Sequence, residues 1–196
     1  AGGVDGFTVA TNGALYVQGH FNADGGVSSD SATQPDAGEA PAALMADAIT
    51  VLSSAWDDTD AALGLSDAGR LAGTTEVSAA FLTGNVPSDP NLSGSSTAYS
   101  GGVENFPRFL EKWTGVDLAY RGSMVALFES EVATGRWGKS NVYNPPNRNW
   151  GFNTLFGSGT RRFPPGTPSV RSYRRVDYRE LNSTEFATAL ASMATP

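Results

Sequence analysis

The sequence contains no cysteine and only two lysines, and it has a single histidine, His20. The absence of cysteine excludes a disulfide framework, a thiolate nucleophile and a cysteine-based metal site. A serine–histidine–aspartate site or a histidine metal site would have one imidazole to use, and we interpret His20 as a surface or turn residue. No apolar run approaches the ~20 residues that a membrane-spanning helix needs, so we expect no transmembrane segment.

Positive charge is missing from the first part of the chain, where no lysine or arginine occurs before Arg70. Residues 1–100 carry 12 acidic residues and 1 basic residue (net −11), and residues 101–196 carry 8 acidic and 12 basic residues (net +4). Six cations share one late segment: Arg161, Arg162, Arg171, Arg174, Arg175 and Arg179. Arginine pairs well with carboxylates, so we expect this segment to bind the acidic half of the same chain or of another copy. The acidic balance of the whole chain argues against nucleic acid as the partner.

Composition favours a single β-rich domain over residues 1–196. Glycine (23) and proline (11) are abundant, charged residues make up only 17%, and aromatic residues reach 10%. Four stretches are typical of short strands closed by turn residues: 7–21, 42–53, 77–86 and 116–131. We expect long surface loops at 22–41, 55–76 and 87–102, and an irregular segment at 144–168 that wraps over the core.

Two architectures fit this pattern of short strands and long inserts. Coils of similar design separated by loops of varied length predict a mainly β fold with a β-solenoid, or β-helix-like, core. The alternative is an antiparallel β-sandwich in which Asn12-Gly13 forms a hairpin turn.

One or two short helices complete the predicted fold. In residues 104–113, apolar side chains recur at i, i+3, i+4 and i+7, which indicates a helix with one apolar face. A second helix is predicted over Thr184–Met193, with Asn182 as its N-cap and Glu185 at the capping-box position. Between the two helices, residues 169–181 alternate in the manner of a strand with a basic outer face.

Asp57, Asp58 and Asp60 form the densest acidic cluster. Oxygen ligands of this kind suit a hard cation, so we hypothesise a structural Ca²⁺ site here, the alternative being a solvated turn. No other cofactor is expected, because the glycine patterns match neither a Walker loop nor a dinucleotide fingerprint.

Aromatic side chains suggest a second class of function. Exposed aromatic rings stack on sugars, and near carboxylates they would suit a polysaccharide-binding or polysaccharide-degrading β-helix module. The candidate glycan contacts are Trp56, Trp137, Tyr143 and Trp150.

Several segments, taken in order, resemble a known group of proteins. They are PAALMADAITVLSSAWDD (41–58), AAFLTGNVPS (79–88), YSGGVENFPRFLEKWTG (99–115), YRGSMVALFESEVATGRWG (120–138) and PNRNWGF (146–152). They are similar to the C-terminal region of PilX-like proteins, which are associated with type IV pili of environmental bacteria, over about residues 5–180. The resemblance implies an exported surface module with a β-helix-like core and no known catalytic residues.

The leading hypothesis is a non-enzymatic extracellular or cell-surface protein of a bacterium. The scarcity of lysine, the acidic pI of about 4.6 and the many small polar residues resemble those of secreted surface proteins. The chain begins at Ala1 without a basic–apolar leader, from which we expect a removed signal or a fragment of a longer precursor. Its expected partners are further copies of itself, in a filament, or pilus components, with a structural or adhesive role.

Overall fold

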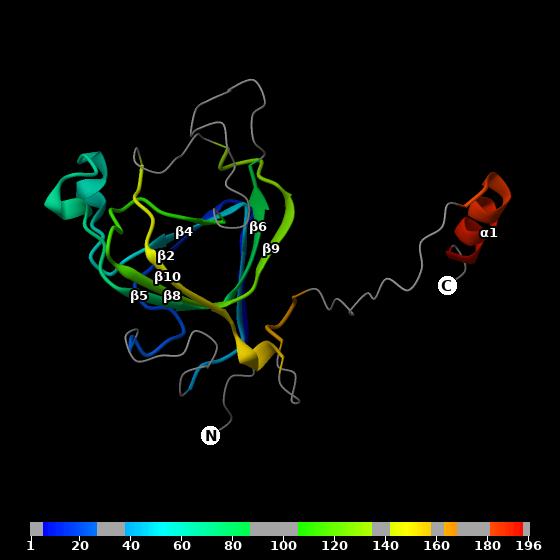
Figure 1. Ribbon diagram of the computed structural model, residues 1–196, viewed down its shortest axis with the longest axis horizontal. Helices are drawn as coiled ribbons and strands as arrows, with labels where there is room; N and C mark the ends of the chain where they lie inside the picture. Colours follow the sequence, from blue (N-terminus) through cyan, green and yellow to red (C-terminus); the bar gives the residue numbers. More distant parts are fainter. Residues whose placement is uncertain are drawn as a thin grey trace.

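The computed structural model describes residues 6–26, 38–86, 106–134, 142–157, 163–167 and 181–193. Within these ranges the protein is mainly β, and its strands form three sheets in which every pairing is parallel. In Figure 1 the sheets surround a common interior.

The largest sheet, sheet A, has the strand order β1 (Phe7–Ala10), β3 (Ala42–Ala46), β6 (Ala80–Asn85) and β9 (Met124–Glu129). Sheet B contains β2 (Ala14–Gln18), β4 (Ala48–Leu52) and β7 (Pro107–Arg108). Sheet C contains β5 (Thr75–Ser78), β8 (Asp117–Gly122) and β10 (Asn147–Phe152). The described 3-10 helices are η1 (Asp58–Ala62), η2 (Ala68–Arg70) and η4 (Thr154–Phe156), and α1 spans Ser183–Met193.

The chain visits the three sheets in rotation. It passes from β3 to β4 to β5, then from β6 to β7 to β8, and each strand pairs with the strand that follows one circuit later. The first circuit reaches sheet C through a bridge from Phe21 to Val77. In the last circuit Asn144 bridges Lys112 before the chain enters β10. Each circuit therefore advances the chain by one strand spacing.

The antiparallel sandwich is excluded as the arrangement of the described strands. Asn12-Gly13 joins β1 to β2, but these strands belong to different sheets, so the predicted hairpin turn is wrong and the dipeptide forms a corner. Three of the four predicted strand stretches also contain a corner, at Asp47, Ala79 and Ser123. Apolar residues continue on both sides of each corner because both flanking strands line the same interior.

The helix predicted at 104–113 is also wrong for its described part. Pro107 and Arg108 form β7 and pair with Ile49 and Thr50 of β4. Nearby aromatic side chains fill the interior instead of forming a helical face, and Trp113 is fully buried. Tertiary burial and strand pairing therefore override the helical spacing. In the segment expected to be irregular, residues 147–152 form β10.

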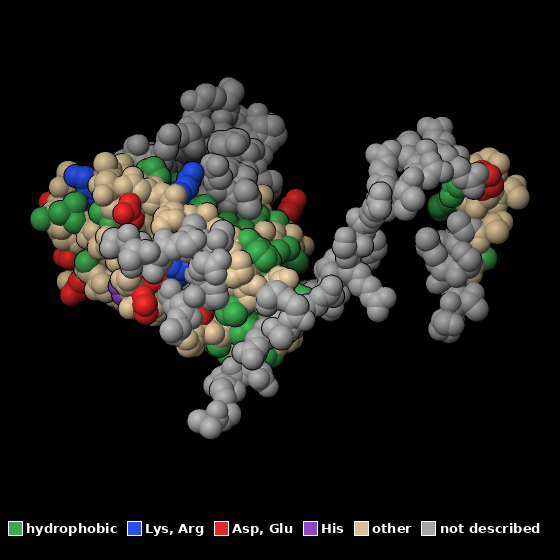
Figure 2. All heavy atoms as spheres, turned by 60° about the horizontal axis from the view of Figure 1, so that its bottom comes forward, with side chains coloured by type: hydrophobic (Ala, Val, Ile, Leu, Met, Phe, Trp, Pro, Cys, Tyr) green, Lys and Arg blue, Asp and Glu red, His purple; other side chains and the backbone are tan. Residues whose placement is uncertain are grey.

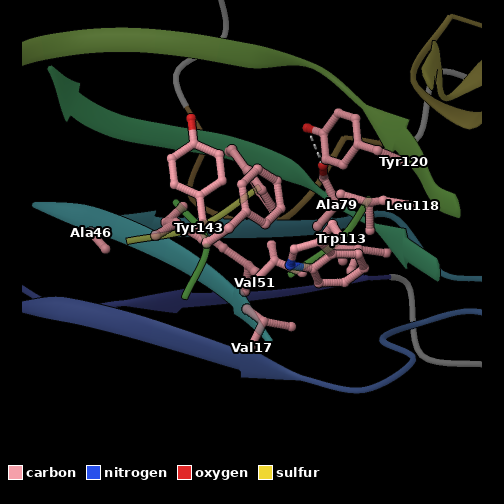
Figure 3. Close-up of a cluster of buried hydrophobic side chains, with 14 residues drawn as sticks. Val17, Ala46, Val51, Ala79, Trp113, Leu118, Tyr120 and Tyr143 are labelled. Carbon is pink, nitrogen blue, oxygen red and sulfur yellow. Dashed lines mark hydrogen bonds between the residues drawn. The ribbon is translucent and has the colours of Figure 1, made fainter. Parts of the chain in front are cut away.

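Ladders of inward-pointing side chains build the core. In sheet C, a ladder of inward side chains runs through Phe21, Val77, Tyr120 and Trp150, and the last two rings lie 5.9 Å apart, edge to face. Figure 3 shows Tyr120 and other aromatic side chains between the sheets, with its hydroxyl donating to the Ala79 carbonyl at 2.8 Å. Burial raises the pKa of Tyr120, which keeps the hydroxyl a neutral donor.

The predicted C-terminal helix is confirmed as α1, with its capping box. The Asn182 side chain accepts the Thr184 and Glu185 amides at 3.1 and 3.0 Å, and the Glu185 carboxylate accepts the Asn182 amide at 3.0 Å. Figure 1 shows α1 apart from the three sheets.

Candidate functional site

Both ends of the stacked sheets present strand edges to which no described strand pairs. At one end are β1 and β2, and at the other are β9, β7 and β10. Val9 belongs to an inward ladder with Leu44, Phe81 and Met124, yet 41% of its surface is exposed because no further circuit covers it among the described residues. Ala126, which faces inward beside Thr83 at the opposite end, is also exposed. The edges are the first candidate association surface.

The β9 end is markedly apolar. Val125, Leu127 and Phe128 of β9 are 40%, 47% and 48% exposed. A register shift between Thr83 and Gly84 of β6 places a bulge in the pairing with β9. Bulges at sheet edges bend a strand and limit indiscriminate pairing with other strands.

The outer face of sheet A is partly covered by the chain after β10, residues 153–157 and 163–167, which we call the return segment. Phe156 packs against Ala43, Ala80 and Leu82 on this face. The Thr8 hydroxyl in β1 donates to the Pro165 carbonyl. The return segment therefore runs from the last circuit back to the first, and it leaves an apolar pocket beside β9.

A long excursion between β4 and β5 is fastened to the stack by a buried cation, Arg70. Its guanidinium donates to the Leu63, Leu110 and Val142 carbonyls, and it lies 5.4 Å from the centre of the Trp56 ring. Arg70, the first cation in the chain, thus has an internal structural role.

Glu76 and Arg121 form a fully buried ion pair between neighbouring strands of sheet C. Glu76 also accepts the Gly25 amide at 3.2 Å, and its own amide donates to His20 Nδ1 at 3.2 Å. His20 is exposed and holds the chain beside this pair, in agreement with its interpretation as a turn residue. These two hydrogen bonds hold residues 20–26 against the ion pair. Removing either partner of the pair would leave an uncompensated buried charge.

Asp47 and Glu111 are further buried acids that sequence reasoning missed. Burial disfavours the charge on Asp47, but the amides of residues 131–133 and the Arg108 charge outweigh it and lower its pKa. Burial raises the pKa of Glu111, against the opposing effect of two hydrogen bonds from Ser53, at 2.5 and 2.7 Å, and of the Arg70 charge. The only signal in the sequence is that each acid adjoins an apolar run that the structure buries.

The six arginines expected to form a binding segment, and Trp137, lie outside the described residues. The other three aromatic candidates belong to the interior. Trp56 and Tyr143 are 8% and 5% exposed, and Trp150 packs on Tyr120 in the core. Trp56 and Tyr143 therefore present no exposed ring on which a sugar could stack. Trp150 is only partly buried, and the Arg148 guanidinium lies 5.1 Å from the centre of its ring. Glycan binding stays a prediction.

The acidic cluster forms local contacts. Asp57 accepts the Thr59 amide and hydroxyl at 2.8 and 2.7 Å and so begins η1, while Asp58 accepts the Trp56 indole N–H at 2.8 Å. These bonds to Thr59 lower the pKa of Asp57. In the described ranges no three acidic or histidine side chains gather as a metal-binding group. The Ca²⁺ site stays a prediction.

Comparisons with models of protein families, with curated proteins and with solved structures find no significant match for this chain. Among the described residues, no helix has the length and apolar character needed to cross a membrane.

Proposed function

We propose that the protein is a non-enzymatic structural module, a short β-solenoid that associates end to end with further copies of itself. The observation that carries the proposal is the passage of the chain, in rotation, through three parallel sheets whose terminal strands have outer edges that no described strand pairs with. A strand edge is a template for another strand, and a solenoid gains stability when a neighbouring coil covers its last one.

The two ends differ, so their association would be head to tail. Strands β1 and β9 lie at opposite edges of sheet A, and both run parallel to the strands between them. A copy placed with its β1 beside β9 would continue the same parallel sheet. Such a heterologous contact does not close on itself and generates a filament.

The charge split supports the same polarity. Two of the cations, Arg70 and Arg121, are buried inside the fold. The late arginine segment therefore supplies most of the remaining positive charge. Attraction between this segment and the acidic half of the next copy would speed association and would weaken with salt.

We also propose an extracellular or bacterial surface location, with pilus components as further partners. The support is the composition, poor in lysine and rich in small polar residues, together with the sequence resemblance described above. Adhesion through the side of such a filament would be the corresponding role.

Sedimentation velocity over a range of protein concentrations, in dilute buffer and at high salt, tests the proposal. Wild type is expected to form species that grow with concentration and shrink at high salt. Val9→Lys should abolish growth, because it places a charge on the exposed inner surface of the first circuit. Leu63→Lys is the matched control, since Leu63 is similarly exposed (39%) but lies on the excursion between β4 and β5. Monomers of wild type under every condition would refute self-association.

A further inference from the structure

An exposed apolar patch covers the outer face of sheet A beside the return segment. Val125 and Leu127 of β9 contribute to it, as do Phe152 and Phe163, which are 51% and 53% exposed. Figure 2 shows hydrophobic side chains gathered on this side of the molecule. Contiguous apolar patches of this kind usually mark an interaction surface.

The patch contains a pocket of about 200 Å³, lined mostly by apolar side chains. Val125, Phe152, Phe156 and Phe163 line it, together with Thr167. An apolar cavity of roughly 150 Å³ accommodates a benzene molecule. The pocket is therefore large enough for one phenyl ring.

Helix α1 carries an exposed phenyl ring of matching size. Phe186 lies in the first turn of the helix and is 59% exposed. An isolated helix of eleven residues is only marginally stable in water, even with a complete capping box. Packing against another part of the protein would stabilise α1.

Chain connectivity places this partner within reach. Thr167 borders the pocket, and α1 begins sixteen residues later, at Ser183. Sixteen residues span up to roughly 50 Å when extended, which is ample to return any face of α1 to the patch.

Figure 1 shows α1 apart from the sheets, with its apolar ring in solvent. We propose that α1 docks from this position onto the outer face of sheet A of its own chain, with the Phe186 ring in the pocket between Val125 and Phe163. The docked helix covers the patch and leaves the edge of β9 exposed. It therefore decides which lateral surface of the module meets solvent, whether or not the ends associate.

Because the chain contains no cysteine, a disulfide can form only between thiols that are introduced by mutation. The double variant Leu127→Cys/Ala187→Cys keeps the Phe186 ring and the pocket intact. Mild oxidation of the dilute protein should close an intramolecular disulfide, seen as faster migration on a non-reducing gel. The matched control is Leu63→Cys/Ala187→Cys, which places the first thiol on the excursion between β4 and β5, away from the patch. The expected result is crosslinking at least tenfold faster in the first pair than in the control.

Equal rates in the two pairs, or crosslinks only between copies, would overturn the proposal. Phe186→Ser gives a second readout that does not require a disulfide. It should increase the binding of a fluorescent apolar dye severalfold, because the patch is no longer covered, and unchanged dye binding would also contradict the proposal. Dilute monomers suffice for both assays, so they do not depend on end-to-end association.

Discussion

Asp47 occupies the corner between β3 and β4 and joins the second circuit to the last one. Its carboxylate accepts the amides of Glu131 and Ala133 at 2.6 and 2.7 Å, and its carbonyl accepts the Ser130 hydroxyl at 2.9 Å. One side chain therefore fixes the segment that leaves β9.

Replacing Asp47 by asparagine should lower the free energy of unfolding by about 1–2 kcal/mol at pH 7, because a charged acceptor of several amides is lost. The folded-state pKa lies below its ordinary value of 3.8, so the contribution is present above that pH and is lost as pH falls through the folded pKa. The variant should lack this acid-dependent loss. Urea unfolding followed by tryptophan fluorescence at pH 7 and pH 3 measures both effects.

Asp67→Asn is the control for this prediction, since Asp67 is exposed and makes no side-chain hydrogen bond to η2. The account of Asp47 fails if both variants unfold at the same urea concentration as wild type at pH 7.

Glu111 should show the opposite dependence on pH. Its folded-state pKa is raised from 4.5, so its contribution to stability is greatest below that pH and is lost as pH rises through the folded pKa. Glu111→Gln removes this loss. The stability of the variant relative to wild type should therefore improve between pH 4 and pH 8 in urea titrations. A relative stability that worsens over this range would show that the charged form is favoured.

At the scale of the elements, the corners direct the chain from one sheet into the next. Gly122 ends β8 just before the chain turns into β9, and a Cβ atom there would lie 2.0 Å from the Ala79 carbonyl oxygen. Gly13 stands at the corner between β1 and β2, where the nearest atom to an added Cβ is 3.8 Å away. The same residue type therefore has different roles at two corners.

Gly122→Ala is expected to destabilise the protein by about 3 kcal/mol or more, because backbone must move to admit the methyl group. Gly13→Ala should stay within about 0.5 kcal/mol of wild type. Thermal unfolding followed by circular dichroism compares the two variants. A similar melting temperature for both would contradict the close packing of circuits at Gly122.

The sequence shows the elements better than it shows their connections. The stretches 42–53, 77–86 and 116–131 are visible as strand-forming, but each is two strands, since an apolar run looks the same whether it is straight or turns a corner. Phe106, Phe109 and Trp113 have helical spacing, and yet an extended chain around a filled interior buries the same residues. The capping box of α1 was predictable because its hydrogen bonds are local.

At the scale of the whole molecule, short strands with varied inserts predicted a mainly β fold, and the parallel sheets agree with it. The buried charges could not be predicted, because Glu76 and Arg121 meet across 45 residues of sequence. The charge split also contains cations that serve folding, Arg70 and Arg121, and only the structure separates these from the remaining cations.

Head-to-tail association is most directly tested by mixing two end variants. Val9→Lys blocks the first circuit and leaves β9 intact, whereas Ala126→Lys blocks the last circuit and leaves β1 intact. Each variant alone should sediment as a monomer, and an equimolar mixture should form a 1:1 dimer that does not grow further. A mixture that stays monomeric, while wild type assembles, would contradict the proposed contact between β9 of one copy and β1 of the next.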